Sequence, residues 1–581
     1  MAPLKTIQVR NKYAPWLSQD TKQLMKERDR AQETAAKTRD IDDWRQYKSL
    51  RNRTTLRMKQ ERKEWEKLKL DSTKHSPSSL WKNVKRWINW SNSGPPTQLF
   101  HQGRFINSPA GLAGAMNSFF IDKVRTLRES IPATETDPLQ ALRGTFQDRE
   151  CLFTFRAVCP NEVLKVLKKL KNSKATGIDN IETAVIKLVA KEILAPLPHI
   201  INLSIENSTF PKLWKQAKVI PLLKKGDPLS PRNYRPVALL PIFSKVLERI
   251  IYDQLVEYLD SNSIIHPNHH GSRTGHSTAT ALVQMYDRWV DEVDQGDMVG
   301  VMMVDLSAAF DMVDHTILLD KLRIYGLTEA ALQWMTSYLD GRSQSVYIDG
   351  CLSPALNIEY GVPQGSILGP LLYILFTNDV PHLVHRHVTD YKDPKAFCDD
   401  CGGMVCYVDD GTYSVRHRNP IILSNDLSTQ YQVISSYMIA NKLVINDDKT
   451  NLMVLGTKGN RVVREQVEIQ AGRFTIKPAK TAELLGCELS DDLKWRHHIR
   501  DSDQSLLKQL NSRVNGLSIV SSRADLETRL MVANGLVMSK LCYLIQLWGG
   551  CEGYLLHSLQ VLQNRAARSV TGWPRFTSTR L

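Results

Sequence analysis

The chain has 581 residues, of which 42% are hydrophobic and 24% are charged. This length and composition exclude a small binding module and a disordered or collagen-like chain, and they predict one large multi-subdomain enzyme or roughly two to four ordinary domains. The 76 Lys and Arg residues exceed the 61 Asp and Glu residues by 15, and this sign favours a polyanionic partner, with nucleic acid first.

The cysteines and the amino terminus indicate the compartment. Nine cysteines without regular spacing give no disulfide framework, and the first residues lack the apolar core of a signal peptide. We therefore expect an intracellular protein of the nucleus or cytoplasm that is not secreted. Because apolar stretches stay shorter than about eighteen residues, we expect no membrane span.

Positive charge is concentrated in residues 1–90, which hold 23 basic and 11 acidic side chains. Within them, residues 19–70 are dense in Lys, Arg, Glu and Gln, and their apolar residues recur at helical spacing, which predicts one or two long basic helices. This arm would bind nucleic acid, or it is a solvated surface helix without a ligand. Residues 80–90 contain three Trp and predict a short aromatic helix, whose rings pack on the main domain rather than stack on bases.

Residues 160–260 alternate helical patterns with short apolar strands, as in mixed α and β folds. Two further apolar strands, at residues 298–304 and 403–408, lead directly into Asp305 and Asp409. After residue 495 the strand patterns fade, and three helices are predicted at residues 504–517, 524–542 and 554–570. No repeat of fixed period is present.

Three acidic residues carry the strongest indication of chemistry. Asp305 ends a hydrophobic strand, and Asp409 and Asp410 lie side by side on a predicted hairpin turn between apolar residues. An isolated Asp-Asp turn is usually a hydrated loop, but desolvated like charges are costly unless they are protonated or bound to cations. Three converging carboxylates would hold two Mg²⁺ ions about 3.5 to 4 Å apart. Such a site predicts phosphoryl or nucleotidyl transfer.

Two other segments suit a nucleotide. Residues 360–373 form a Gly- and Pro-rich turn with Gln364 that runs into an apolar helix, and a backbone approaches a ligand closely at such glycines. Upstream, residues 218–226 and 233–240 read as a strand pair with basic side chains. These cations are suited to a triphosphate.

The order of these segments resembles the reverse transcriptase of non-long-terminal-repeat retrotransposons, close to the jockey-like elements of animals. The resemblance covers residues 161–495. Its blocks, in family order, are 173–180 (Ser-Lys-Ala-Thr-Gly-Ile-Asp-Asn), 233–237 (Asn-Tyr-Arg-Pro-Val), 270–278 (His-Gly-Ser-Arg-Thr-Gly-His-Ser-Thr), the Asp305 segment, 362–366 (Val-Pro-Gln-Gly-Ser), 407–410 (Tyr-Val-Asp-Asp), 441–450 and 485–495.

The resemblance implies an α+β, right-handed polymerase fold of fingers, palm and thumb. We expect a basic helical arm at residues 1–90 and a linker with a helical amino-terminal extension at residues 91–159. Fingers and palm would follow at residues 160–495, and a helical thumb at residues 496–581.

The resemblance also implies site residues. Asp305, Asp409 and Asp410 match the metal-binding carboxylates, and Leu306 would place its backbone beside the second metal. Phe310 matches the bulky side chain that excludes a 2′-hydroxyl and so selects deoxynucleotides, although a core phenylalanine is the alternative.

For the remainder of the nucleotide, Gln364 and Gly365 resemble residues along the nucleotide and template. Lys218 and Arg235 resemble the fingers cations that hold the triphosphate, with Lys224 and Lys225 competing for the role of Lys218. Lys449 resembles the proposed general acid for pyrophosphate.

The activity implied is RNA-directed DNA polymerisation with two Mg²⁺ ions, or Mn²⁺ as a substitute. The partners implied are an RNA template, a DNA or RNA primer and deoxynucleoside triphosphates. An endonuclease would come from a separate protein, because residues 1–150 are too short and too basic for one, so the chain reads as a partial element product. The alternative is a catalytically idle, domesticated or degraded RNA-binding protein that retains the polymerase fold.

Two clusters of potential metal ligands are weaker. Cys398 and Cys401 have the spacing of half a zinc knuckle, but a lone pair is weak and incidental thiols in a loop are favoured. The histidines between residues 266 and 276 are expected to serve a template-side loop rather than a metal.

Overall fold

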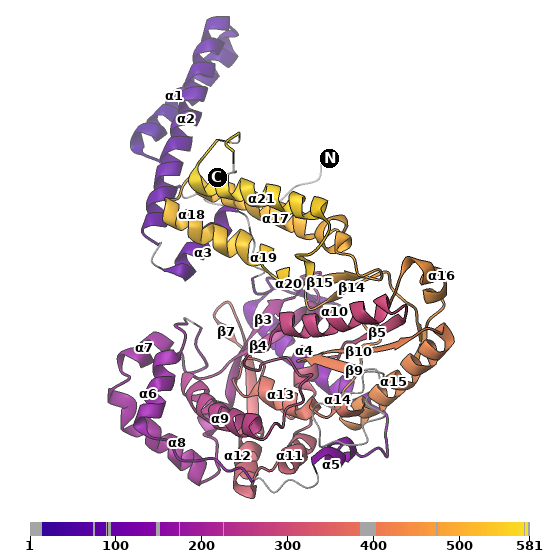
Figure 1. The fold of residues 1–581 in the computed structure, drawn as a ribbon. Helices are drawn as coiled ribbons and strands as arrows, with labels where there is room; N and C mark the ends of the chain where they lie inside the picture. Colours follow the sequence, from indigo (N-terminus) through magenta and orange to yellow (C-terminus); the bar gives the residue numbers. More distant parts are fainter. Residues whose placement is uncertain are drawn as a thin grey trace. The chain divides into compact units, whose positions relative to one another are not determined.

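The computed structural model describes residues 14–73, 76–88, 90, 94–146, 152–173, 175–224, 226–383, 403–471, 474–574 and 576–578. The chain divides into two compact units (Figure 1). Unit 1 combines residues 1–92 with residues 498–545 and 549–581, and unit 2 comprises residues 93–497 with residues 546–548.

Unit 1 is helical, as the sequence predicts for its two ends. The basic arm forms a pair of helices that pack on each other, α1 (Gln19–Thr38) and α2 (Ile41–Asp71). They reverse at Arg39, which has a left-handed backbone with φ of 59°. The other helices of the unit are α3 (Pro77–Trp87), α17 (Leu506–Ser521), α18 (Leu526–Ala533), α19 (Ser539–Leu541) and α21 (Gly553–Thr571).

The aromatic helix α3 packs within unit 1. A side chain at Gly535 would overlap the ring of Trp81, so Trp81 is a packing residue, as expected, although its partner belongs to the carboxyl-terminal helices. The middle one of the three predicted carboxyl-terminal helices contains a π-helical turn, Asn534–Met538, between α18 and α19.

Unit 2 mixes helices and strands, which confirms the α+β class in its general form. Its amino-terminal part contains β1 (Leu99–His101), β2 (Arg104–Ile106), α4 (Pro109–Glu129), α5 (Gln140–Phe146), α6 (Pro160–Lys169), α7 (Thr183–Leu188), α8 (Pro196–Glu206), β3 (Gln216–Leu223), β4 (Tyr234–Leu239), α9 (Ile242–Ser261) and α10 (Thr278–Asp294).

The central part of unit 2 contains β5 (Met298–Val304), α11 (His315–Ile324), α12 (Glu329–Leu339), β6 (Arg342–Ile348), β7 (Cys351–Leu352), β8 (Leu356–Ile358), α13 (Gly369–Thr377) and α14 (Val380–Leu383). Its last part contains β9 (Gly403–Tyr407), β10 (Asp410–His417), α15 (Pro420–Ala440), β11 (Asn451–Leu455), α16 (Arg461–Arg464), β12 (Ile469–Ala471), β13 (Phe474–Ile476), β14 (Thr481–Leu484) and β15 (Cys487–Ser490).

A four-stranded antiparallel sheet, in the order β11-β5-β10-β9, lies in the middle of unit 2. All residues of β5 are buried, because helices cover both faces of the sheet. A Cβ at Gly300 would lie 2.6 Å from Leu427 of α15, whereas α10 packs on β5 and β9 along the other face (Figure 1). A strand covered on both sides reads as a continuous apolar run.

A second sheet has the order β4-β3-β6-β7, with β8 also paired to β6. Strand β3 is antiparallel to β4 and parallel to β6. The strand pair expected at residues 218–226 and 233–240 is therefore confirmed. Helix α4 contributes Leu112, Met116 and Phe120 to a core shared with Val219 and Ala238, so it covers one face of this sheet.

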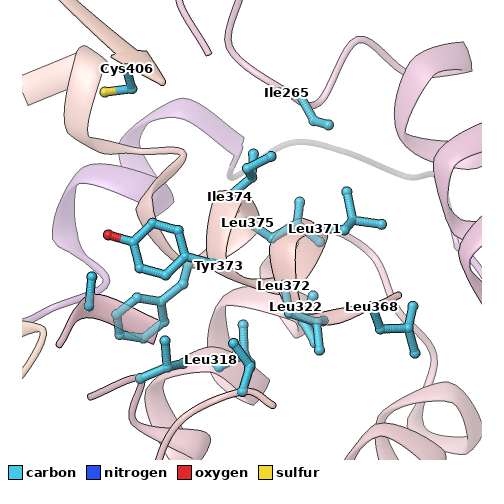
Figure 2. Packing of buried hydrophobic residues seen from close by; sticks show 14 of the residues in the cluster. Ile265, Leu318, Leu322, Leu368, Leu371, Leu372, Tyr373, Ile374, Leu375 and Cys406 are labelled. Atoms are coloured by element: carbon cyan, nitrogen blue, oxygen red, sulfur yellow. The ribbon is translucent and has the colours of Figure 1, made fainter. Parts of the chain in front are cut away.

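Helix α13 lies in the main core of unit 2. Every residue of α13 except Pro370 is buried, and Figure 2 shows its side chains among Leu318 and Leu322 of α11, Ile265 and Cys406. This apolar surrounding explains the apolar run after the Gly- and Pro-rich turn. Among the described residues, no helix combines the length and the apolar character needed to cross a membrane.

Candidate active site

Three carboxylates meet at one end of the central sheet. Asp305 directly follows β5, and Tyr407 pairs with Asp410 across the β9–β10 hairpin, so Val408 and Asp409 form its turn. In the pairing of β10 with β5, Gly411 lies opposite Val304. One further step along both strands places Asp410 opposite Asp305, because antiparallel partners run in opposite directions.

The hairpin turn rests on a loop that the sequence reasoning did not connect with it. The amide of His270 donates to the carbonyl of Cys406 at 2.9 Å, and the amide of Cys406 donates to the carbonyl of Asn268 at 2.9 Å. Gly271 then passes so close to Val408 that a Cβ there would lie 2.7 Å from the Val408 nitrogen. Val408 itself has a φ of 59°. The loop therefore fixes the strained turn that presents Asp409.

His269 and His270 of this loop are buried and make polar contacts within the fold. Burial lowers the pKa of His269 to about 4, so its ring is neutral, and it lies 3.2 Å from the carbonyl of Thr377. His270 contacts Thr280 and Gln284. Across the described residues, no group of three His, Cys, Asp or Glu side chains has the arrangement of a preformed metal cluster.

Burial and mutual repulsion raise the affinity of the carboxylates for protons. Burial raises the pKa of Asp410 to about 6, and the charges of Asp409 and Asp305 add to this effect. The pKa of Asp409 is also raised, first by burial and then by Asp305, while Lys224 and Lys449 oppose the shift. A bound cation would relieve the same repulsion, and oxygen donors suit a hard divalent ion.

Leu306 and Lys449 lie beside Asp305. The amide of Asn446 donates to the carbonyl of Asp305 at 2.8 Å, and the amide of Ser307 donates to the carbonyl of Val444 at 2.9 Å. Leu306 therefore occupies a non-hydrogen-bonded position of the pairing, and its own carbonyl points away from the facing segment. The ammonium of Lys449 lies 3.1 Å from Oδ2 of Asp305.

Phe310 is half-buried and stacks on the buried Tyr373, with ring centroids 4.8 Å apart and planes inclined by 22°. The backbone before it is left-handed at Ala308, with φ of 53°. Stacking on Tyr373 fixes one face of the Phe310 ring, so its position is set by the core rather than by solvent.

Gln364 and Gly365 are held between Asp311 and β4. The side-chain amide of Gln364 donates to Oδ1 of Asp311 at 2.9 Å, and its backbone carbonyl accepts from the amide of Ala238 at 2.8 Å. Gly365 has φ of 124°, and a Cβ there would overlap the carbonyl of Ala238. Only glycine fits this position. Asp311, which the sequence reasoning did not single out, has its pKa raised to about 6 by burial.

The basic side chains of the β3–β4 hairpin have different surroundings. Lys218 donates to Oδ1 of Asn180 at 3.3 Å, and its ammonium lies 4.3 Å from the centre of the Tyr347 ring. Lys224 is six residues further along the strand direction, about 20 Å away at the rise of a strand. Its charge acts on both Asp409 and Asp410.

Arg235 extends from the face of the hairpin that also carries Lys218. It is exposed and pairs with Leu222 in the register of β3 with β4, while the amide of Lys224 donates to the carbonyl of Asn233 at 2.8 Å. Along the paired strands, Arg235 therefore lies near Lys224 and far from Lys218. Lys225, Cys398 and Cys401 lie outside the described residues.

Comparison with known proteins shows what the central segment is similar to. Residues 222–489 match the family described as "Reverse transcriptase (RNA-dependent DNA polymerase)". The chain is 28% identical over 420 residues to the "RNA-directed DNA polymerase from mobile element jockey" of Drosophila funebris, a match that covers 72% of this chain and 44% of that protein. It is 29% identical over 427 residues to the "Probable RNA-directed DNA polymerase from transposon BS" of Drosophila melanogaster, covering 71% and 45%.

A third relative, the "Probable RNA-directed DNA polymerase from transposon X-element" of Drosophila melanogaster, is 27% identical over 415 residues, with coverage of 71% and 44%. The matches span less than half the length of these three relatives. The resemblance to reverse transcriptases of non-long-terminal-repeat retrotransposons is confirmed.

Proposed function

We propose that this chain, whose residues 222–489 match the reverse transcriptase family, is the RNA-directed DNA polymerase of a non-long-terminal-repeat retrotransposon. The observation that carries the proposal is the meeting of Asp305, Asp409 and Asp410 at one end of the central sheet. The central sheet would be the palm, the β3–β4 hairpin the fingers, and the carboxyl-terminal helices the thumb.

The carboxylates of Asp305, Asp409 and Asp410 and the carbonyl of Leu306 would hold two divalent ions. Their donor atoms are all oxygens, which suits Mg²⁺, with Mn²⁺ as a substitute. When bound, such ions activate the primer 3′-hydroxyl and stabilise the departing pyrophosphate. The raised pKa values of Asp409 and Asp410 support this assignment, since both carboxylates gain from a neighbouring positive charge.

The triphosphate would be held by cations on two sides. Arg235 and Lys224 would contact it from the hairpin, and Lys449 from the side of Asp305, where it would donate a proton to pyrophosphate. We assign Lys224 rather than Lys218 to this role, because Lys218 is occupied by Asn180 and Tyr347 and Lys224 acts on the carboxylates.

The sugar and base would lie against the turn that follows β8. Phe310, backed by Tyr373, would occupy the space of a 2′-hydroxyl and so favour deoxynucleotides. Gln364 and Gly365 would line the nucleotide and template. The partners of the reaction would be an RNA template, a DNA or RNA primer and deoxynucleoside triphosphates.

Primer extension tests the proposal. The parent and the Asp409→Ala, Asp410→Ala double variant would be compared on a poly-ribonucleotide template with Mg²⁺ and labelled deoxynucleotides. A matched control removes the same charge at two exposed acids of α10, Asp291→Ala with Asp294→Ala. We expect extension by the parent and the control, and none by the site variant, with equal RNA binding by all three.

The second candidate function is RNA binding by an idle polymerase fold, which the 23 basic residues among residues 1–90 favour. If neither the parent nor the control extends the primer in Mg²⁺ or Mn²⁺ while both bind RNA, the polymerase assignment is wrong and this second function replaces it.

A further inference from the structure

A cavity of about 110 Å³ lies between α4, the second sheet and the turn that carries Gln364. Its apolar lining includes Phe120, Tyr234 and Tyr360, and its charged lining includes the cations Lys123, Arg125, Lys215 and Arg342 against the acids Asp311 and Glu359. It lies on the face of β3 and β4 opposite to Arg235, because its strand residues Tyr234 and Ala238 alternate with Arg235 along β4. The cavity therefore opens on the other face of the hairpin from Arg235, although Gln364 lines it and the charges of Lys449 and Lys224 act on Lys123 in its lining.

Arg342 is the unusual member of this lining. Its side chain is buried, with a relative exposure of 2%, and its Nε donates to the carbonyl of Tyr338 at 2.6 Å. Its other two nitrogens, Nη1 and Nη2, are buried without a hydrogen-bond partner among the described residues. A buried charged donor without a partner is costly, so two N–H groups of a fixed guanidinium fork are left for a ligand.

The fold holds Arg342 in this position. Arg342 is the first residue of β6 and pairs with Ile358 of β8. The centre of the Tyr338 ring lies 4.2 Å from the guanidinium carbon of Arg342. Two residues along the strand, Gln344 donates from its side chain to Asn117 of α4 at 3.0 Å. Alternate residues of β6 thus face α4, and Arg342 faces the same space.

The charges around the cavity do not neutralise Arg342. Lys215 is half-buried, and burial followed by the charge of Arg342 lowers its pKa, which places two cations near each other. Asp340 acts on Lys215 and Glu359 lines the cavity, yet no ion pair between Arg342 and an acid is formed within the described part of the chain. Asp311 is engaged by Gln364.

We propose that this cavity binds a small oxyanion, the phosphate or carboxylate group of a low-molecular-weight ligand, through the fork of Arg342 and the ammonium of Lys215. A guanidinium fork binds planar carboxylates and phosphates through two parallel hydrogen bonds. The cavity of about 110 Å³ is smaller than one of about 150 Å³ that accepts benzene, so it takes inorganic phosphate or the carboxylate of a small aliphatic acid. The occupant lies directly behind Gln364.

Titration calorimetry on the full chain, at constant ionic strength and without divalent ions or nucleotide, tests this site. The probes are inorganic phosphate and acetate, which separate the two sources of the oxyanion. We expect at least one of them to bind, with affinity reduced at least about tenfold in Lys215→Gln and lost in Arg342→Met. Arg342→Met removes a buried charge whose Nη1 and Nη2 have no hydrogen-bond partner among the described residues, and Lys215→Gln provides a milder variant if Arg342→Met does not fold.

Two control variants place the bound anion. Lys212→Gln removes an exposed cation of the short helical turn that also carries Lys215, outside the cavity lining, and should bind the probe as the parent does. Lys224→Gln removes a cation of the proposed triphosphate site and reports a probe that binds there instead. If binding survives in Arg342→Met and Lys215→Gln but is lost in Lys224→Gln, the anion sits among the polymerase cations and the proposal is wrong. If neither probe binds the parent, the cavity holds water only, which also overturns it.

Discussion

The ion pair between Lys321 and Asp379 gives a quantitative test of the core of unit 2. Both side chains have an exposure of 0%. The ammonium of Lys321 lies 2.9 and 3.0 Å from the two oxygens of Asp379, 2.7 Å from the carbonyl of Phe376 and 2.8 Å from the hydroxyl of Tyr437. Tyr437 donates to Oδ1 of Asp379 at 2.6 Å. The substitution Lys321→Met removes the positive charge and leaves the carboxylate buried.

The unfolding free energy lost in Lys321→Met is limited by the free energy needed to protonate the carboxylate that is left behind. Breaking a buried pair by removing one partner destabilises a protein by about 3 to 5 kcal/mol. The carboxylate left behind can instead be protonated, and protonating an acid with a reference pKa of about 3.9 costs about 4 kcal/mol at pH 7 and about 1.5 kcal/mol at pH 5. We therefore expect Lys321→Met to lose about 4 kcal/mol of unfolding free energy at pH 7 and markedly less at pH 5.

Equilibrium unfolding in urea at the two pH values measures these losses. Because the chain has two compact units, the transition that responds to Lys321→Met is the one to analyse. The double variant Lys321→Met, Asp379→Asn should regain most of the stability, since Asn keeps an acceptor for Tyr437 without a buried charge. Lys168→Met, at an exposed lysine of α6, should stay within about 0.5 kcal/mol of the parent.

Two results would refute this reasoning. One is a loss below about 1 kcal/mol at pH 7, which would mean that water or another cation compensates Asp379. The other is a loss of equal size at pH 5 and pH 7, because a carboxylate that escapes by protonation must show the difference.

Three further predictions concern the candidate site. Because the folded-state pKa of Asp410 is raised to about 6, ionisation of Asp410 lowers the stability of the metal-free protein as the pH rises from about 4 through 6. Without metal at pH 7.5, Asp410→Asn should therefore have a higher melting temperature than the parent, and Mg²⁺ should raise that temperature less in the variant. Equal melting temperatures of the two proteins would contradict this. The Cβ of Gly271→Ala would overlap Val408, so this variant should lose about 1 to 3 kcal/mol of unfolding free energy. It should also have a lower kcat with little change in the KM for the nucleotide. An unchanged kcat would show that the loop does not fix the turn. Phe310→Val should reduce the ratio of kcat/KM for deoxynucleotides over ribonucleotides at least tenfold, about 1.4 kcal/mol, while Phe310→Tyr retains it; a ratio unchanged in Phe310→Val assigns the ring to the core alone.

Strands buried on both faces were predictable from the sequence. The run at residues 298–304 coincides with β5, because helices on both sides make every position apolar. Residues 420–440 gave no comparable pattern, since Ile421 and Ile422 are exposed at the start of α15 and blur its apolar stripe. The carboxylates were found because each lies at the end of an apolar strand.

The contacts between distant segments were not predictable. Gly271 and Val408 are far apart in sequence, and nothing in either segment indicates that one packs on the other. The resemblance pointed to Lys218, with Lys224 and Lys225 as competitors, and the sequence did not show that the extended strand separates Lys218 from Lys224 by about 20 Å. Asp311 had a local indication, since it follows Phe310 within the same motif, but its bond to Gln364 depends on the fold. The domain boundaries at residues 90, 159 and 495 stay predictions.

Helix α4 shows that the candidate site is larger than the segment of residues 222–489 that carries the family match. Arg128 of α4 forms an ion pair with Asp314 at 2.5 Å, and its guanidinium lies 4.2 Å from the centre of the Tyr360 ring. The charge of Lys123 acts on Asp311, the residue that holds Gln364. Without α4, the apolar face of β3 and β4 that packs on it would be exposed, and Asp314 would lose this partner. A fragment limited to the matched segment would therefore lack part of the support of both the Asp305 segment and the Gln364 turn.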